Sequence, residues 1–123
     1  DTLHNLSYQI LLETNGALSL ANVPNYVIKI VDVKTPGSGM QNSFLPENLQ
    51  YLDLQDELKF VLMDKMDYKF ALNFLQENKP NISTVHFSPV TDVLNPKELA
   101  GWLLEDGIKA KLTLQLHKII GLE

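Results

Sequence analysis

Val27-Ile28-Lys29-Ile30-Val31 is the stretch that decides the fold, because it is apolar at nearly every position rather than at every second one. Nearly continuous apolar runs of this length suit strands that are covered on both faces, as in parallel sheets. Phe60-Val61-Leu62 repeats the pattern further along the chain. In all, five segments are expected to be strands: residues 9–14, 26–33, 57–63, 84–88 and 111–116.

Two segments between these strands have the residue spacing of helices. Residues 95–106 begin with Asn95-Pro96, an N-cap residue followed by a proline at the first helical position. Residues 67–78 carry an apolar stripe made of Phe70, Ala71, Phe74 and Leu75. A short third helix is expected at residues 46–54. Strands that alternate with helices predict βαβ units, and therefore an α/β fold with a mostly parallel sheet.

Composition narrows the class of protein. The chain has 123 residues, a length that suits one domain, and 45% of them are hydrophobic, which is enough for a core. Its net charge is −5. No basic run alternates with aromatic residues, and no apolar run approaches the roughly 20 residues of a membrane helix, so neither nucleic acid nor membrane is an expected partner. The chain has no cysteine, so it cannot itself ligate an iron–sulfur cluster, and a cytoplasmic location is expected. Residues 122–123 are expected to be a tag remnant after a domain of residues 1–121.

Polar residues gather where the expected strands end. Ligands of α/β proteins collect at the carboxyl ends of the strands, so we expect a binding site along this rim. The stretches concerned are Glu13-Thr14-Asn15-Gly16, Asp32-Val33-Lys34, Phe87-Ser88-Pro89-Val90 and Gln115-Leu116-His117-Lys118.

Each of these features also has a purely structural explanation. Glu13 can be a solvated carboxylate, and Asn15-Gly16 can be a simple turn. Lys34 can hold an anionic group, and Asp32 can pair with it because the two side chains share one strand face. Residues 35–39 lack the spacing of a phosphate-binding loop and are expected to be flexible.

Other polar residues give no recognised catalytic or metal pattern. Ser88 lacks the G-x-S-x-G context of a serine hydrolase, although the backbone around it can hold an adenine or ribose edge. His117 can be an exposed edge histidine, and His4 and His86 are expected to be structural or exposed; together they make no zinc motif. A solvated acidic face is expected from Glu47, Asp53, Asp56 and Glu57.

Five stretches, taken in order, resemble the carboxyl-terminal half of the 7-carboxy-7-deazaguanine synthase family of radical S-adenosylmethionine enzymes. They are Leu12-Glu13-Thr14-Asn15-Gly16, Asp32-Val33-Lys34-Thr35-Pro36-Gly37-Ser38-Gly39-Met40, Asp56-Glu57-Leu58-Lys59-Phe60-Val61, Phe87-Ser88-Pro89-Val90 and Gln115-Leu116-His117-Lys118-Ile119-Ile120. The resemblance implies a partial (β/α) barrel whose cluster-binding half is missing from this chain. This part alone is therefore expected to be inactive and to hold no catalytic residue.

For the complete enzyme, the resemblance implies a carbon–nitrogen lyase of queuosine biosynthesis. It converts 6-carboxy-5,6,7,8-tetrahydropterin to 7-carboxy-7-deazaguanine with S-adenosylmethionine, a 4Fe-4S cluster and magnesium. The cofactor carries out the radical chemistry, while the protein supplies orientation and exclusion of water. The cluster and magnesium ligands are expected in the missing half, so no metal ligand is expected here.

The resemblance also implies roles for individual residues. Asp32-Val33-Lys34 matches a family serine-proline-lysine segment that lies against S-adenosylmethionine, and only the lysine is retained. Phe87-Ser88-Pro89-Val90 matches a second strand end that contacts this cofactor. Glu13, Asn15 and His117 match positions expected near the pterin, where a carboxylate can accept ring N–H bonds and a histidine can bond a carboxylate.

Two other interpretations of the sequence stay open. One is a different radical S-adenosylmethionine enzyme, such as a glycyl-radical activating enzyme, which shares the barrel but not the pterin. The other is a non-catalytic α/β binding domain. A half-barrel leaves a strand edge and an apolar face uncovered, so a homodimer, or an open apolar groove near the first strand, is expected.

Overall fold

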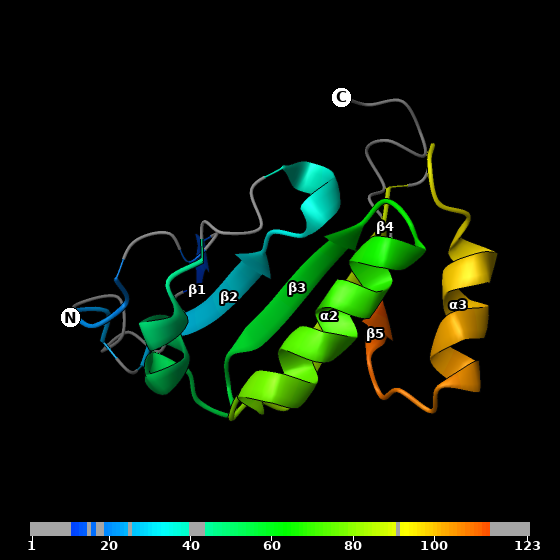
Figure 1. The fold of residues 1–123 in the computed structure, drawn as a ribbon. Helices are drawn as coiled ribbons and strands as arrows, with labels where there is room; N and C mark the ends of the chain where they lie inside the picture. The colour runs from blue at the N-terminus through cyan, green and yellow to red at the C-terminus, as the bar shows by residue number, and fades with distance from the viewer. Residues whose placement is uncertain are drawn as a thin grey trace.

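The sheet is open and entirely parallel. The computed structural model describes residues 11–14, 16, 19–24, 26–39, 44–90 and 92–113. Within them, neighbouring strands in the sheet are also neighbours in sequence, in the order β1-β2-β3-β4-β5 (Figure 1). The strands are β1 (Leu11–Thr14), β2 (Ile28–Val33), β3 (Glu57–Leu62), β4 (Thr84–Pro89) and β5 (Lys111–Leu112). The predicted α/β fold is confirmed, and the sheet does not close, as in a partial barrel.

Both predicted helices are present and connect parallel strands. Helix α2 (Lys65–Asn78) joins β3 to β4, and helix α3 (Pro96–Glu105) joins β4 to β5. Helix α2 starts before the predicted boundary because Asp64 is its N-cap, accepting a hydrogen bond from the Asp67 N–H at 2.9 Å. The expected short third helix is the 3-10 helix η2 (Pro46–Tyr51), and a second 3-10 turn, η1 (Pro36–Ser38), follows β2.

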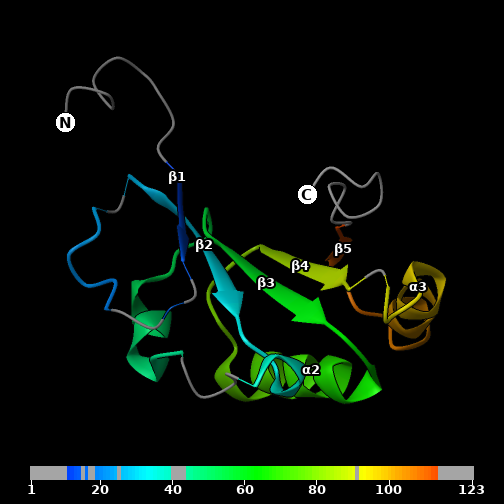
Figure 2. The same cartoon turned by 90° about the horizontal axis from the view of Figure 1, so that it is seen from above.

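One face of the sheet forms the core. Figure 2 shows α2 lying across this face, with α3 beside β4 and β5. The side chains beneath the helices alternate along the strands and are almost fully buried: Val31, Val33, Leu58, Phe60 and Leu62. Phe60 and Phe87 meet edge to face with ring centroids 5.6 Å apart, and Tyr68 of α2 packs on Phe87.

The opposite face is only half buried and carries charged residues. Along β2 and β3 every second residue is half exposed. No described helix lies over this face in Figure 2. The alternation differs from the two-sided burial that the apolar run of β2 suggested. The half-exposed positions are Ile28, Ile30, Asp32, Glu57, Lys59 and Val61. We call this side the open face.

The expected acidic surface is wrong for Asp56, which is fully buried. Its Oδ2 lies 3.4 Å from Lys29 Nζ, and the Lys29 side chain is 3% exposed. The Asp56 carboxylate also accepts hydrogen bonds from the backbone N–H groups of Lys29 and Asp53, at 2.8 and 2.7 Å. A buried charge needs such partners, and they fix the start of β3 against β2.

The two ends of the sheet are less completely described. Strand β1 is an edge strand among the described elements, and Leu11 on it is 57% exposed. The homodimer expected from an uncovered edge stays a prediction. Residues 9–10 and 114–116 of the predicted first and last strands, and residues 122–123, lie outside the described residues.

Candidate functional site

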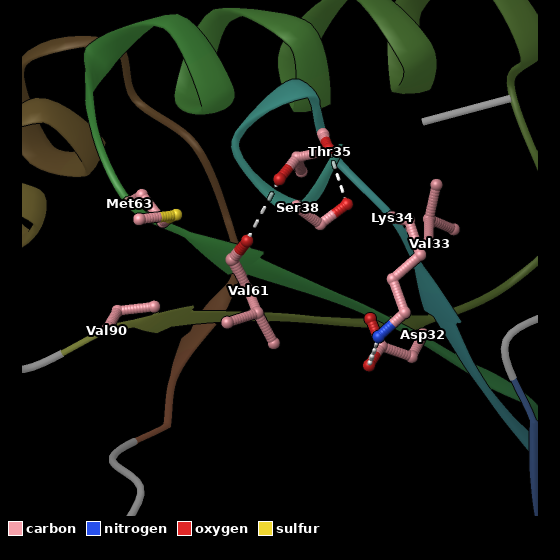
Figure 3. A pocket seen from close by; sticks show the side chains of 8 residues that line it. All are labelled: Asp32, Val33, Lys34, Thr35, Ser38, Val61, Met63 and Val90. Carbon is pink, nitrogen blue, oxygen red and sulfur yellow. Dashed lines mark hydrogen bonds and ion pairs between the residues drawn. The ribbon is translucent and has the colours of Figure 1, made fainter. Parts of the chain in front are cut away.

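A cleft opens at the carboxyl ends of β2 and β3, on the rim where the sequence predicted a site. Its volume is about 260 Å³. Figure 3 shows its lining side chains, which come from β2, from the turn after β2, from β3 and from the end of β4. The residues are Asp32, Val33, Lys34, Thr35, Ser38, Val61, Met63 and Val90. We call this space the rim cleft.

The turn that forms one wall of the rim cleft is a hydrogen-bonded 3-10 turn, and its expected flexibility stays a prediction. Thr35 Oγ1 donates a hydrogen bond to Val61 O at 3.2 Å, and Ser38 Oγ donates one to Thr35 O at 2.7 Å (Figure 3). The Gly37 N–H donates to Asp67 Oδ1 at 2.7 Å. A Cβ on Gly37 would lie 2.4 Å from Asp67 Oδ2, so this close approach requires glycine.

Asp67 is a fully buried residue whose role is not evident from the sequence. Its second oxygen accepts a hydrogen bond from the Met63 N–H at 2.9 Å. One carboxylate therefore connects the turn after β2 to the end of β3, and both of these segments line the rim cleft. The sequence signal was an aspartate in the first turn of a helix, which by itself indicates only helix capping.

Asp32 and Lys34 form the predicted ion pair, with Lys34 Nζ 3.1 Å from Asp32 Oδ2. The side chains of both residues are about one-third exposed in the rim cleft. The other carboxylate oxygen, Asp32 Oδ1, is buried and has no hydrogen-bond partner among the described residues, and the same is true of Ser88 Oγ. Buried polar atoms are nearly always bonded, so the unpaired Asp32 Oδ1 in the lining of the rim cleft is a candidate acceptor for a polar ligand, whereas Ser88 does not line the cleft.

The Phe87-Ser88-Pro89-Val90 stretch is placed partly in the core. The Phe87 ring packs between Phe60 and Tyr68, so its side chain does not line the rim cleft. Ser88 is fully buried and lies opposite Val61 in the sheet register. The Val90 N–H donates to Leu62 O at 2.9 Å, which fixes the Val90 side chain at the cleft. The cofactor contacts expected of this stretch stay predictions.

A second cleft adjoins the first on the open face. Its volume is about 290 Å³, and it shares Asp32 and Lys34 with the rim cleft. The lining residues are Glu13, Thr14, Ile30, Asp32, Lys34 and Lys59. We call it the face cleft. Glu13, a predicted substrate residue, is therefore brought next to Asp32 and Lys34, whereas Asn15 and His117 lie outside the described residues.

His86 also belongs to the open face, where its hydrogen bonds agree with the structural role expected of it. Its Nε2 lies 2.5 Å from Glu57 Oε1, and its Nδ1 lies 2.9 Å from Thr113 Oγ1. Both ring nitrogens are thus engaged by β3 and by the end of β5. Across the part of the chain that the structure describes, no three His, Cys, Asp or Glu residues gather in a way that could hold a metal ion. Nor is any described helix both long and apolar enough to cross a membrane.

Comparison with known proteins finds relatives that all bear the same name. Over 92% of its length, this chain is 43% identical to a 7-carboxy-7-deazaguanine synthase of Koribacter versatilis. Proteins of the same name from Thermoplasma acidophilum and Leptospira interrogans are 34% and 35% identical over 90% and 89% of this chain. No family model and no solved structure matches.

The extent of these matches is as informative as their identity. The chain covers 56%, 53% and 47% of the three relatives, so it spans about half the length of the curated relatives it matches. Such a share agrees with the expected carboxyl-terminal half. Over nine-tenths of its length, the chain belongs to the 7-carboxy-7-deazaguanine synthase family and corresponds to about half of such a protein.

Proposed function

We propose that this chain forms the carboxyl-terminal wall of the active site of a radical S-adenosylmethionine enzyme. The complete enzyme converts 6-carboxy-5,6,7,8-tetrahydropterin to 7-carboxy-7-deazaguanine. The observation that carries the proposal is the pair of adjoining clefts that meet at Asp32 and Lys34, in a chain whose relatives bear the synthase name. Two neighbouring spaces suit a reaction that brings a cofactor and a substrate together.

The rim cleft has the chemistry to hold S-adenosylmethionine. This molecule carries ribose hydroxyl and ammonium donors, a carboxylate and an adenine ring. A hydroxyl or ammonium group can donate to Asp32 Oδ1, which has no partner among the described residues. Lys34 places a positive charge at the same end of the cleft. When bound beside a 4Fe-4S cluster, the cofactor supplies the radical that abstracts hydrogen from the substrate.

The face cleft is the proposed place of the pterin. Glu13 can accept hydrogen bonds from ring N–H groups, while Ile30 offers an apolar contact to the flat ring. The volumes of the two clefts lie near the lower end of the roughly 300–1,000 Å³ of ordinary ligand sites. The work of this chain is to bind, orient and keep water away.

The ligands of the iron–sulfur cluster and of magnesium are proposed to lie outside the described residues. The 123 residues contain no cysteine, so the thiolates that bind an iron–sulfur cluster have to lie outside them. Magnesium prefers oxygen ligands, and the described residues bring no three suitable groups together. We therefore assign to the described residues contacts with the organic ligands only.

The test uses the complete natural protein that contains these residues, with its cluster assembled. We expect it to bind S-adenosylmethionine and to convert the carboxytetrahydropterin. Asp32→Asn should weaken cofactor binding by roughly tenfold or more, because bonds to a charged group are lost. Asp92→Asn, at an exposed carboxylate, is the matched control. Binding of the cofactor without turnover of the pterin would favour a different radical enzyme. Binding of neither ligand would reject the proposal.

A further inference from the structure

Lys59 occupies the centre of the open face. In the sheet register it stands between Asp32 on β2 and His86 on β4. Its side chain is half buried and lines the face cleft together with Glu13. This lysine is the direct register partner of Asp32 across the β2–β3 strand pair.

The carboxylates around Lys59 are already engaged by other cations. Asp32 Oδ2 is 3.1 Å from Lys34 Nζ, and Glu57 Oε1 is bound by His86 Nε2. Glu57 lies two residues before Lys59 on the same strand face, where it could pair with the lysine. Its carboxylate pairs with His86 instead. Among the described residues, Lys59 therefore forms no ion pair of 4.0 Å or less.

The charges of the face cleft are separated. Glu13 on β1 provides the negative wall, the Asp32–Lys34 pair is internally neutral, and Lys59 on β3 provides the positive wall. Because Lys59 lines the face cleft without an ion-pair partner among the described residues, an anionic ligand group in the cleft can form a charge-assisted bond with it. A ligand with N–H donors at one end and a carboxylate at the other matches this arrangement.

We propose that Lys59 binds the carboxylate group of a ligand in the face cleft and thereby helps to select carboxylated ligands. The inference rests on the proposed function and deepens it. Two ligands of that function carry such a group: the pterin substrate, at its 6-position, and S-adenosylmethionine, in its amino-acid portion. Because the face cleft and the rim cleft share Asp32 and Lys34, both ligands come within the neighbourhood of Lys59.

The experiment measures dissociation constants of the complete natural protein for two matched pairs of ligands. One pair is 6-carboxy-5,6,7,8-tetrahydropterin and tetrahydropterin without the carboxylate. The other is S-adenosylmethionine and 5′-methylthioadenosine, which lacks the amino-acid portion. The variants are Lys59→Met, which removes the charge at similar size, Lys59→Arg, which retains it, and Lys69→Met as an exposed control on α2.

We expect Lys59→Met to weaken the binding of the carboxylated ligand of one pair by about tenfold to a hundredfold, the loss typical of a bond between charged groups. The dissociation constant of its carboxylate-free partner should stay within about twofold of the native value. The affected pair identifies the source of the carboxylate. Lys59→Arg should recover most of the affinity, and Lys69→Met should change nothing. Equal weakening within both pairs, or no weakening in either, overturns the inference while leaving the proposed function standing. A native protein that binds none of the four ligands overturns both.

Discussion

Replacing Asp67 by alanine tests whether one buried carboxylate holds the rim cleft together. Asp67 is fully buried and accepts two backbone hydrogen bonds, from Gly37 at 2.7 Å and from Met63 at 2.9 Å. Asp67→Ala removes both acceptors at once and leaves two N–H groups without a partner. The turn after β2 and the end of β3 should then separate.

The size of the effect follows from these bonds. A hydrogen bond to a charged group contributes about 1.5–3 kcal/mol, so two give roughly 3–6 kcal/mol. Gly37 is exposed, so water can replace part of its bond, and alanine is the better helix former. We therefore expect Asp67→Ala to lower the free energy of unfolding by about 2–4 kcal/mol. Asp67→Asn keeps one oxygen acceptor and should lose about half as much.

Urea unfolding provides the measurement, followed by the fluorescence of Trp102, the single tryptophan, which lies in α3. The midpoint should fall while the dependence on urea stays unchanged, because the folded state remains compact. Asp92→Ala, at an exposed carboxylate, is the control and should stay within about 0.5 kcal/mol of the native value. A loss below about 1 kcal/mol for Asp67→Ala would refute the reasoning.

Two further predictions concern buried polar residues of the same sheet and helix layer. Asp56→Ala should lower the free energy of unfolding by about 3–5 kcal/mol, because it leaves the Lys29 ammonium buried and unpaired. Replacing Lys29 by methionine in the same chain should recover part of this loss in urea unfolding. A double variant no more stable than Asp56→Ala would contradict this reasoning. Burial, and then the hydrogen bond to Asp106, raise the pKa of Tyr68 well above its usual value near 10. Above about pH 10 the unfolded chain therefore releases this proton while the folded protein keeps it. Stability should therefore fall as the pH rises above about 10, and less steeply in Tyr68→Phe; equal slopes in the two proteins would show that the Tyr68 proton does not contribute.

Features encoded by neighbouring residues were predictable from the sequence. The apolar runs of β2 and β3 predicted strands, and Asn95-Pro96 predicted the start of α3, where the Asn95 side chain accepts a hydrogen bond from the Lys97 N–H at 2.8 Å. The Asp32–Lys34 pair was predictable for the same reason, since residues two apart on a strand share a face. In each case the sequence spacing alone determines which groups can meet.

Features that join distant segments were not predictable. Gly37 and Asp67 are 30 residues apart, and the Lys29 N–H and Asp56 Oδ1 are separated by 27. Nothing near Asp56 in the sequence distinguishes it from the exposed acidic residues around it, so it was assigned to a solvated face. The strand register places β3 beside β2, and this brings the Asp56 carboxylate next to Lys29, where the two buried charges pair.

The open face has a charge pattern that limits what can cover it. Asp32, Lys59 and His86 form one row across three strands, at positions where a packed α/β sheet would carry apolar residues. Covering this row with an apolar helix would desolvate the Lys59 ammonium without giving it a partner, at a cost of several kcal/mol. A surface that lies over these strands must therefore bring polar groups to the row or leave room for a ligand and water. The same strands that build a closed core under α2 thus build a cavity wall on their other side, and the clefts at Asp32 and Lys34 are where that cavity begins.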